Sequence, residues 1–498
     1  MSCTDNRTLE ERGVTVIEGK EPFPLPQPLV SEMSAAEIES ATGGVLLSGA
    51  RAAVPSGVSI DSRTIRPGEL FFAIRGPRLD GHLYIEAALA RGAFGAVVDT
   101  TYAPAAGHAA GRTLLRVQDT HRALKELAAE VRRRWRGSLV AVTGSVGKTT
   151  TKEFAAHVLA AEYSVYHSPG NYNNLFGLPL ALLELSAADH IGVFEMGMSA
   201  PGEIAEMCRI ARPDVGVLTA VAPVHLEFFG SVDEIARAKG ELADALDARG
   251  TLVYNADDPR VRALAERSRA RVVSFGCAAG ADVSASDIEV AALDETRFTL
   301  RASGETRLAV LPLAGVHYVM NALAAVALGR HYRIALDEIV ESLKDLRQAP
   351  MRGQVVRFKE GFTLIDDSYN SNPRALVQMI QTVGRLRASG RRILVAGEMR
   401  ELGPESKRFH FECGEAAAQS GLELVVAVGG DARELAQGAL AGGMAESAVR
   451  FFPEAEEAAR FVLHALRPGD LVLVKGSRGA HLERVVERVR GAFEEAPA

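Results

Sequence analysis

A phosphate-binding loop is the strongest chemical signal in the sequence. The run Thr-Gly-Ser-Val-Gly-Lys-Thr-Thr at residues 143–150 follows an apolar stretch typical of a strand and precedes a helix-forming stretch. Glycines there let backbone N–H groups approach phosphate oxygens, Lys148 adds positive charge at the β- and γ-phosphates, and a threonine hydroxyl can ligate Mg²⁺. The usual pattern begins with glycine where this chain has Val142. We still predict a nucleotide phosphate site, formed by Gly144, Ser145, Val146, Gly147, Lys148, Thr149 and Thr150.

Amide and carboxylate side chains follow this loop along the chain. Asn171, Asn173 and Asn174 lie within four positions, and their side chains suit either a polar ligand or a turn. Glu195 ends the apolar run at 190–195. A carboxylate at the carboxyl end of a parallel strand lies where ligands bind in open α/β sheets. Glu195 is therefore a candidate Mg²⁺ ligand, with a helix-capping or solvated glutamate as the alternative.

Two further residues have weaker signals. His225 follows a strand-like stretch ending at Ala220 and is a candidate second metal ligand, although a lone histidine is more often structural. Lys239 lies in a helix-forming stretch, and the residues alone indicate an ordinary surface lysine.

The elements that must position these residues form three α/β units. Short apolar runs alternate with helical stretches, which favours parallel sheets covered by helices. Residues 282–311 differ and predict short antiparallel strands, followed by helices near 318–331 and 336–346. We predict a flexible extension at 1–30, a small N-terminal α/β module at 31–137, a central P-loop ATPase-like parallel sheet at 138–347, and a Rossmann-like doubly wound domain at 348–498.

Composition excludes several classes of protein. The 498 residues are 47% hydrophobic and 24% charged, with a formal net charge of -7, so the basic footprint of a nucleic-acid-binding protein is missing. The four cysteines have no metal-ligand spacing. No apolar run reaches the roughly 18 residues that cross a bilayer, and no secretory signal is present. We expect a cytoplasmic protein without membrane insertion.

Taken together, these motifs resemble the Mur ligase family. Residues 143–150, 170–179, 195–197, 219–225 and 238–241 occur in that family's order, and the resemblance extends over about residues 56–490. Residues 366–373, 397–403 and 474–479 are similar to the branch that adds D-alanyl-D-alanine. Asp61-Ser62-Arg63 and Asp80-Gly81-His82 resemble its UDP-binding module.

The resemblance implies an activity and a set of roles. The chain would be a monomeric ATP-dependent ligase that joins D-alanyl-D-alanine to UDP-N-acetylmuramoyl-tripeptide through an acyl phosphate, in peptidoglycan synthesis. The residues implied in catalysis are Lys148, Glu195, His225 and Lys239. Two Mg²⁺ ions would be held by Thr149, Glu195, His225 and a carbamylated Lys239. Outside the phosphate loop, ATP would contact Asn321 (adenine), Arg352 (phosphate) and Asp367 (ribose). The substrates would contact Ser62, Arg63, Asn173, Asn174, Asn370, Asn372 and Lys475.

ATP residues on two domains predict that the C-terminal domain closes, with a hinge at residues 350–353. The chain departs from the family where Ala220 and Tyr318 replace the usual asparagines and Glu398 replaces a commoner aspartate. Two alternatives stay open. One is a relative that adds another amino acid, such as the folylpolyglutamate type, and the other is a nucleotide-binding regulatory protein without ligase activity.

Overall fold

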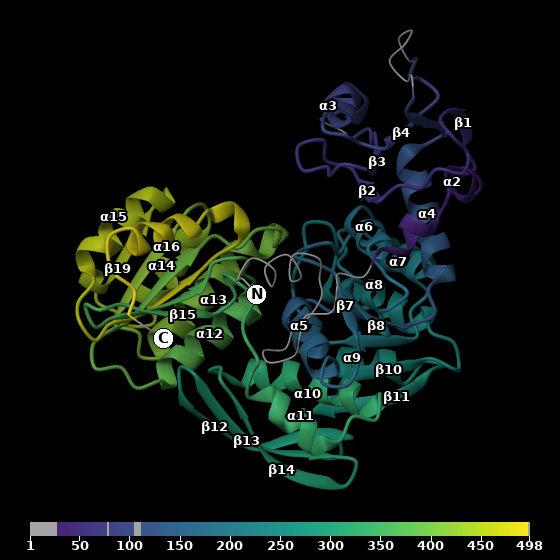
Figure 1. The fold of residues 1–498 in the computed structure, drawn as a ribbon. Helices are drawn as coiled ribbons and strands as arrows, with labels where there is room; N and C mark the ends of the chain where they lie inside the picture. The colour runs from purple at the N-terminus through teal and green to yellow at the C-terminus, as the bar shows by residue number, and fades with distance from the viewer. Residues whose placement is uncertain (1–26, 77–78, 104–110, 497–498) are drawn as a thin grey trace.

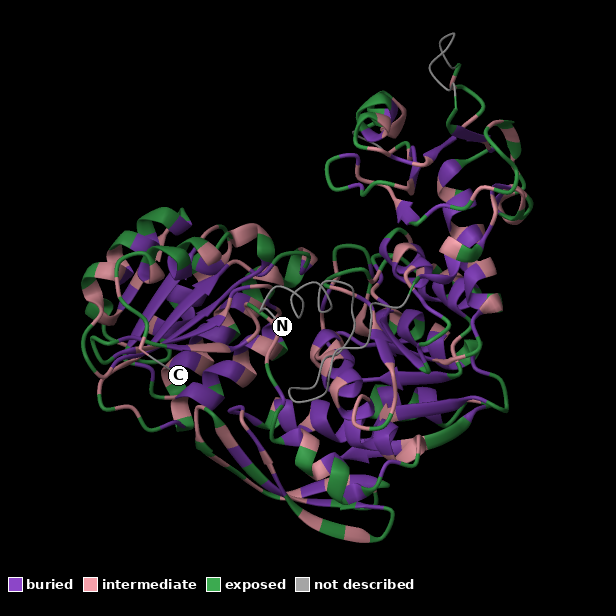
Figure 2. Ribbon diagram, viewed as in Figure 1, coloured by how far each residue is buried: buried purple, intermediate pink, exposed green. Residues whose placement is uncertain are grey.

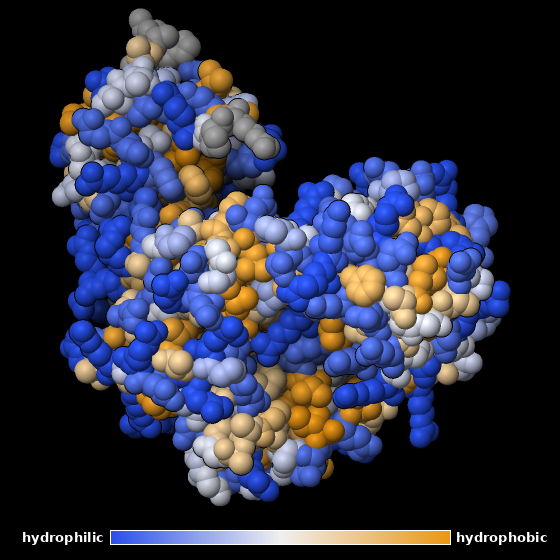
Figure 3. All heavy atoms as spheres, turned by 180° about the vertical axis from the view of Figure 1, so that it is seen from behind, coloured by the Kyte–Doolittle hydropathy of each residue, from blue (hydrophilic) through white to orange (hydrophobic). Residues whose placement is uncertain are grey.

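Three separate sheets organise the chain. The computed structural model describes residues 27–76, 79–103 and 111–496, and its strands form sheets of five, nine and six strands. Each sheet lies in one of the three predicted α/β segments, which confirms the three-domain α/β fold. The N-terminal and C-terminal domains project from the central domain as separate lobes (Figure 1). From behind, a notch separates the two lobes (Figure 3).

The N-terminal domain is a small mixed sheet with helices beside it. Its strands β2 to β5 run parallel, and β1 is antiparallel to β5. In spatial order they are β1 (Val45–Ser48), β5 (Thr113–Arg116), β4 (Gly95–Val98), β3 (Glu69–Phe72) and β2 (Gly57–Ser59). The helices are η1 (Leu29–Glu32), α2 (Ala35–Thr42), η2 (Gly81–Tyr84), α3 (Ile85–Ala90) and α4 (Thr120–Arg134).

The predicted flexible extension reaches too far along the chain. Residues 1–26 lie outside the described residues, but Pro28 forms a bridge with Ser186 and the Leu29 N–H donates to the Leu185 carbonyl at 2.8 Å. Leu29 and Val30 are buried. The prediction is wrong at this end because burial of two apolar side chains fixes the segment against the central domain.

The central domain is built on a nine-stranded sheet. The order is β14 (Glu305–Leu311), β13 (Glu295–Ala302), β12 (Val283–Ala292), β11 (Arg271–Gly276), β10 (Thr251–Asn255), β9 (Val215–Leu218), β6 (Ser138–Thr143), β8 (Ile191–Glu195) and β7 (Val165–His167). Strands β6 to β12 pair in parallel, whereas β12, β13 and β14 pair antiparallel. The antiparallel strands predicted at 282–311 are therefore confirmed.

Alternate side chains of the inner central strands enter opposite cores. Leu139 and Ala141 of β6 pack into one hydrophobic cluster, whereas Val140 and Val142 pack into another. Such strands are covered on both faces and read as unbroken apolar runs, and β8 and β9 beside β6 are buried along their whole length (Figure 2). One face is covered by α6 (Gly177–Leu183), α7 (Glu203–Ala211), α8 (Val232–Ala245) and α9 (Pro259–Ala265). The other is covered by α5 (Lys148–Leu159), α10 (Val316–His331) and α11 (Leu336–Leu343).

The C-terminal domain is doubly wound. Its order is β15 (Gln354–Arg357), β16 (Thr363–Asp367), β20 (Leu471–Lys475), β17 (Arg392–Gly397), β18 (Leu424–Val428) and β19 (Val449–Phe452), and only β15 is antiparallel to its neighbour. One face carries α12 (Pro373–Arg385), α13 (Ser406–Gln419) and α14 (Ala432–Ala441). The other carries α15 (Ala455–Ala465) and α16 (Glu483–Arg490).

The central and C-terminal domains pack directly on each other. Leu293, in the β12–β13 turn, and Ala314 join the hydrophobic cluster under α12. Arg357 of β15 pairs with Asp294 at 2.7 Å. These contacts fix the two domains edge to edge, so their strand ends can contribute to one site. Within the described part of the chain, no helix is both long and apolar enough to cross a membrane.

Candidate active site

One cavity of about 770 Å³ collects nearly all the predicted site residues. It lies between the central and C-terminal domains, and residues from both line it. The predicted residues on its wall are Ser145, Val146, Gly147, Lys148, Thr149, Thr150, Asn173, Asn174, Glu195, His225, Lys239, Asn321, Arg352, Asp367, Asn370, Asn372 and Lys475. Residues more than 300 positions apart in the chain therefore meet in one place.

The phosphate loop joins β6 to α5 through two constrained glycines. Gly144 has φ 154° and Gly147 has φ 84°, values that side chains disfavour. A Cβ on Gly144 would lie 1.9 Å from the Thr219 hydroxyl, and one on Gly147 would lie 2.5 Å from the Asn321 side-chain oxygen. The Thr219 hydroxyl also donates to the Val146 carbonyl at 2.6 Å. Close packing thus holds the loop in one shape at the start of α5.

Glu195 ends β8 as predicted, and its carboxylate is buried beside the loop. The Thr149 hydroxyl donates to one oxygen at 2.6 Å, and the Asn173 amide donates to the other at 2.8 Å. Lys148 donates to the Gly144 carbonyl at 2.9 Å. Burial lowers the pKa of Lys148, and the negative charge of Glu195 opposes that shift. A cation, a carboxylate and a hydroxyl therefore face the same cavity.

Lys239 is not a surface residue, so the interpretation from the residues alone is wrong. It is 1% exposed on α8 and lines the cavity. Burial lowers the pKa of Lys239 well below its usual value, with Lys148 adding to the shift and Glu195 opposing it. The sequence carried a signal, because Ile235, Lys239 and Leu242 are spaced on one helical face and both flanking residues are apolar and buried.

His225 connects the two domains. Its Nδ1 forms a short hydrogen bond with the carboxylate of Glu401, from the loop after β17. This bond and the charge of His225 lower the pKa of Glu401. The backbone carbonyl of Glu401 also accepts from Glu227 N–H at 3.3 Å. Nearby, Arg374 of α12 contacts the Asp258 carboxylate and the Val221 carbonyl, both at 3.3 Å. Sequence reasoning missed Glu401 and Arg374 as partners, since such long-range contacts leave no local pattern.

A buried ion pair lines the C-terminal side of the cavity. Asp367 ends β16 and Lys475 ends β20, and these two residues are paired in register on neighbouring parallel strands. The Lys475 ammonium donates to the Asp367 carboxylate at 2.6 Å and to the Asn370 carbonyl at 3.0 Å. This arrangement matches the rule that ligands bind at the carboxyl ends of parallel strands.

Several predicted polar ligands also have local structural roles. Asn174 accepts from the N–H groups of Phe176 and Gly177 at 3.0 and 2.8 Å, and Asn372 accepts from Ala375 N–H at 3.0 Å. Asn372 is the N-cap of α12, whereas Asn174 fixes the turn that leads into α6. Asn321 accepts from the Thr151 hydroxyl at 3.2 Å. Their remaining amide hydrogens stay available at the cavity wall.

Arg352 stands in the segment between the last central helix and β15. Its guanidinium lies 4.3 Å from the centre of the Tyr369 ring. The positive charge of Arg352 reaches the central domain, where it contributes to lowering the pKa values of Lys148 and Glu153. A ligand phosphate between Arg352 and Lys148 would meet positive charge from both domains.

Ser62 and Arg63 do not line this cavity. They lie between β2 and β3, in the N-terminal domain that forms a separate lobe (Figure 1). The Arg63 side chain is 85% exposed and pairs with Asp61 at 2.7 Å. The central and C-terminal domains therefore form the cavity without Ser62 and Arg63. A ligand that contacts both the cavity and these two residues must extend from one lobe to the other.

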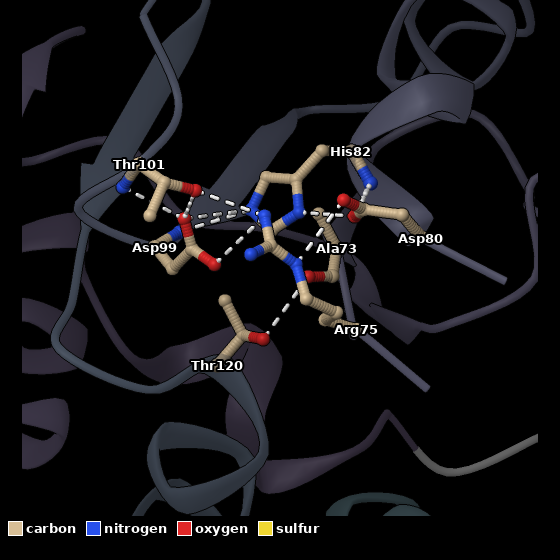
Figure 4. Close-up of polar contacts among 7 residues, drawn as sticks. All are labelled: Ala73, Arg75, Asp80, His82, Asp99, Thr101 and Thr120. Atoms are coloured by element: carbon tan, nitrogen blue, oxygen red, sulfur yellow. Dashed lines mark hydrogen bonds and ion pairs between the residues drawn. The ribbon is translucent and has the colours of Figure 1, made fainter. Parts of the chain in front are cut away.

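The predicted Asp80–His82 motif has an internal role (Figure 4). Asp99 N–H donates to His82 Nε2 at 3.0 Å, so Nδ1 carries the ring proton and donates to Asp80 at 2.6 Å. Arg75 pairs with Asp80 at 3.1 Å and donates to Thr101 at 2.9 Å. Both ring nitrogens of His82 are occupied, and the cluster braces the lobe that carries Arg63.

An aromatic contact missed by the sequence reasoning joins the N-terminal domain to the cavity. His121, near the start of α4, stacks on Phe176 with ring centres 3.9 Å apart and planes 8° from parallel. Its Nε2 donates to the Leu175 carbonyl at 3.0 Å. Both rings line the cavity.

At Ala220, where the family usually has asparagine, the backbone carbonyl accepts from Ser145 N–H at 2.6 Å, a contact that any side chain allows.

Comparison with known families gives a consistent result along the chain. The profile described as "Mur ligase family, catalytic domain" matches residues 55–132, "Mur ligase middle domain" matches 142–329, and "Mur ligase, glutamate ligase domain" matches 351–478.

Individual relatives agree over nearly the full length. The chain is 34% identical over 432 residues to the UDP-N-acetylmuramoyl-tripeptide--D-alanyl-D-alanine ligase of Bacillus subtilis, covering 86% of this chain and 92% of that one. A crystal structure of MurF from Acinetobacter baumannii superposes with a TM-score of 0.82 at 29% identity, over 94% and 99% of the two chains. MurF from Thermotoga maritima, solved in complex with ADP, gives 0.76 at 31% identity, over 87% and 96%.

Proposed function

The chain belongs to the Mur ligase family, and on that premise we propose that it joins D-alanyl-D-alanine to UDP-N-acetylmuramoyl-tripeptide at the expense of ATP, in peptidoglycan synthesis. One observation carries the proposal. The phosphate loop of the central domain lines the same cavity as Asp367, Tyr369, Asn370 and Asn372, which belong to the segment 366–373 that resembles the D-alanyl-D-alanine-adding branch.

The chemistry requires an activated carboxylate. An amine does not displace oxide from a carboxylate, so a carboxylate oxygen of the tripeptide first attacks the γ-phosphorus of ATP and ADP leaves. The amine of D-alanyl-D-alanine then attacks the acyl carbon, a tetrahedral intermediate forms, and phosphate departs as the new amide loses a proton. Water must be excluded, because it would hydrolyse the acyl phosphate.

The first step brings two anions together. Lys148 and Arg352 face the cavity from opposite domains, and their positive charges reduce the repulsion between the carboxylate and the γ-phosphate. The same two residues hold the phosphates in line with the attacking oxygen, which lowers the entropic part of the barrier. Asn321 would contact adenine and Asp367 the ribose.

The oxygen donors at the loop fit Mg²⁺. Thr149 and Glu195 present a hydroxyl and a buried carboxylate within 2.6 Å of each other, and Mg²⁺ prefers such hard oxygen ligands together with phosphates. When bound, the ion supplies further neutralisation of phosphate charge. Thr149 and Glu195 would hold it, while the Asn173 amide orients the carboxylate through its 2.8 Å hydrogen bond.

Lys239 fits a second Mg²⁺ site only after modification. A buried amine is stabilised in its neutral form, and burial lowers the pKa of Lys239 even though the negative charge of Glu195 opposes the shift. A neutral amine adds to carbon dioxide and releases a proton, giving a carbamate with two oxygen donors. Together with His225, this carbamate would hold the second ion.

The substrates would reach the cavity from two sides. Ser62 and Arg63 would hold the UDP end on the N-terminal lobe, where the exposed Arg63 guanidinium can exchange Asp61 for a diphosphate. On the opposite side, Asn370, Asn372 and Lys475 present polar groups for the dipeptide acceptor. Asn173 and Asn174 would contact the peptide near the phosphate loop.

We place this enzyme in the cytoplasm as a monomer. The cytoplasmic location follows from the proposed substrates, because ATP, the UDP-linked tripeptide and the dipeptide are water-soluble molecules.

The test is phosphate release from Mg-ATP, with the tripeptide substrate or D-alanyl-D-alanine omitted in turn. We expect release to require both, with UDP-N-acetylmuramoyl-pentapeptide detected by mass spectrometry. If L-glutamate replaced the dipeptide with equal rate, the acceptor assignment would be wrong. If ATP were hydrolysed at the same slow rate with or without substrates, a regulatory nucleotide-binding protein would replace the ligase.

A further inference from the structure

Arg352 lies in a backbone segment of unusual shape. Its neighbours Met351 and Gly353 have φ values of 61° and 85°, so two left-handed residues flank it. Left-handed conformation is rare for methionine and persists when surrounding contacts impose it. The shape of this segment determines whether the Arg352 side chain points into the cavity.

The C-terminal domain supplies part of those contacts. Gly353 N–H donates to the Asp366 carbonyl at 2.8 Å, and Tyr369 N–H donates to the Met351 carbonyl at 3.2 Å. The Tyr369 ring also lies beneath the Arg352 guanidinium. These bonds fix Arg352 relative to its own domain but leave its position relative to the phosphate loop open.

Tyr318 supplies the contact from the central domain. Its hydroxyl donates to the Arg352 carbonyl at 2.9 Å and accepts from the Gln348 amide at 3.2 Å. The ring is 5% exposed within the core under α10. A Cβ on Gly353 would lie 2.2 Å from this hydroxyl, so the segment and the phenol fit closely together.

The helix that carries Tyr318 also contacts the phosphate-loop helix. Asn321, one turn further along α10, accepts from Thr151 of α5. A rigid connection therefore runs from the phosphate loop through α5 and α10 to the Arg352 backbone.

We infer that Tyr318 is a positioning residue that holds Arg352 toward the ATP phosphates through its backbone carbonyl. The inference rests on the proposed ATP site. Loss of the hydroxyl would free the segment to sample other shapes, and ATP binding would then have to restore the competent one, which weakens apparent affinity.

The test measures binding of a non-hydrolysable ATP analogue by calorimetry, without turnover. Tyr318→Phe keeps the ring and should raise the Kd about 3- to 10-fold, the loss expected for one net hydrogen bond. Tyr163→Phe is the matched control, because that hydroxyl also donates to a backbone carbonyl, of Tyr332 at 2.7 Å, away from the cavity. It should leave the Kd unchanged.

The second arm separates positioning from general destabilisation. In an Arg352→Ala background, Tyr318→Phe should have no further effect on Kd, because the group it positions is gone. The inference is overturned if Tyr318→Phe binds the analogue as tightly as the wild type, or if the loss is equally large without Arg352. Failure of the ligase assignment would appear separately, as wild-type protein that binds the analogue but forms no pentapeptide.

Discussion

At the residue scale, the site holds positive charges at the place where the substrate carboxylate and the γ-phosphate of ATP, two anions, must approach each other. Lys148 from the phosphate loop and Arg352 from the interdomain segment face the same cavity, and Glu195 lies beside them with Thr149 hydrogen-bonded to it. Lys148 and Thr149 begin α5 and Glu195 ends β8, whereas Arg352 lies in the segment before β15. The chemistry therefore depends on a few charges fixed by the backbone, and substitutions there should change the rate more than the stability.

Lys148→Met should lower kcat/KM by about 10²-fold or more, because a preorganised cation near the transferring phosphoryl group is lost. Steady-state phosphate release measures the effect. The melting temperature should stay close to that of the wild type, since Lys148 donates only to the Gly144 carbonyl among its described contacts. Lys344→Met, on an exposed surface pair, is the control and should keep full activity. A Lys148 variant within a few-fold of wild type would contradict its role.

Lys239 should carry a carbamate when carbon dioxide is present. NMR of protein equilibrated with carbon-labelled bicarbonate should show a carbamate resonance that Lys239→Arg lacks. Burial is the physical reason, because it favours the neutral, nucleophilic amine. Identical spectra from the two proteins would refute carbamylation and leave the second metal site without its oxygen donors.

At the element scale, short motifs located those site residues that lie at the end of a strand or at the start of a helix. The phosphate loop and Glu195, at the end of β8, were predictable because strand ends of parallel sheets meet at one edge. Asp367, at the end of β16, was indicated by the family resemblance alone. The apolar residues on the same helical face already indicated that Lys239 is buried, although we interpreted it as a surface lysine. By contrast, the His225–Glu401 contact joins residues 176 positions apart, and the His121–Phe176 stack joins two domains. No local pattern specifies such contacts.

The loop between α6 and β8 holds a carboxyl group that burial disfavours. Burial raises the pKa of Asp189 to about 6, from 3.8, although Ser186 N–H donates to it. In the unfolded chain Asp189 ionises near its usual value, so the folded protein loses stability as pH rises from about 4 to about 6 and no more above it. The loss amounts to about 2–3 kcal/mol.

Asp189→Asn removes this titration, since the amide stays neutral at every pH. The melting temperature of the variant, relative to wild type, should therefore increase between about pH 4 and about pH 7. Differential scanning calorimetry across that range measures the difference. A constant offset between the two proteins would show that Asp189 ionises in the folded state as it does in the unfolded chain.

At the scale of the whole molecule, the site exists only while two domains are in contact. The cavity has walls from both, and His225–Glu401 and Arg374–Asp258 connect them. The three-domain architecture was predictable from the alternation of strands and helices. The burial of Leu29 and Val30 was not, because it depends on contacts with a segment near Leu185 that is distant in the sequence. Interfaces between domains of one chain commonly allow relative motion.

The C-terminal domain should close further on ATP and the tripeptide substrate. Small-angle scattering should give a smaller radius of gyration with both ligands than without, since they bind residues of both domains. Arg374→Ala removes an interdomain contact and should enlarge the unliganded protein, whereas Arg408→Ala, whose partners Glu405 and Glu412 lie in its own domain, should not. An unchanged radius on ligand addition would argue against a hinge at residues 350–353.

The most direct test of a ligase acting through an acyl phosphate follows an oxygen atom. The tripeptide substrate is labelled with heavy oxygen in its terminal carboxylate, and the inorganic phosphate released during turnover with D-alanyl-D-alanine is analysed by mass spectrometry. If the carboxylate attacks the γ-phosphorus, one labelled oxygen per turnover must leave with the phosphate, and this is the result we predict. Unlabelled phosphate would mean that water attacks ATP, and the ligase assignment of this cavity would be wrong.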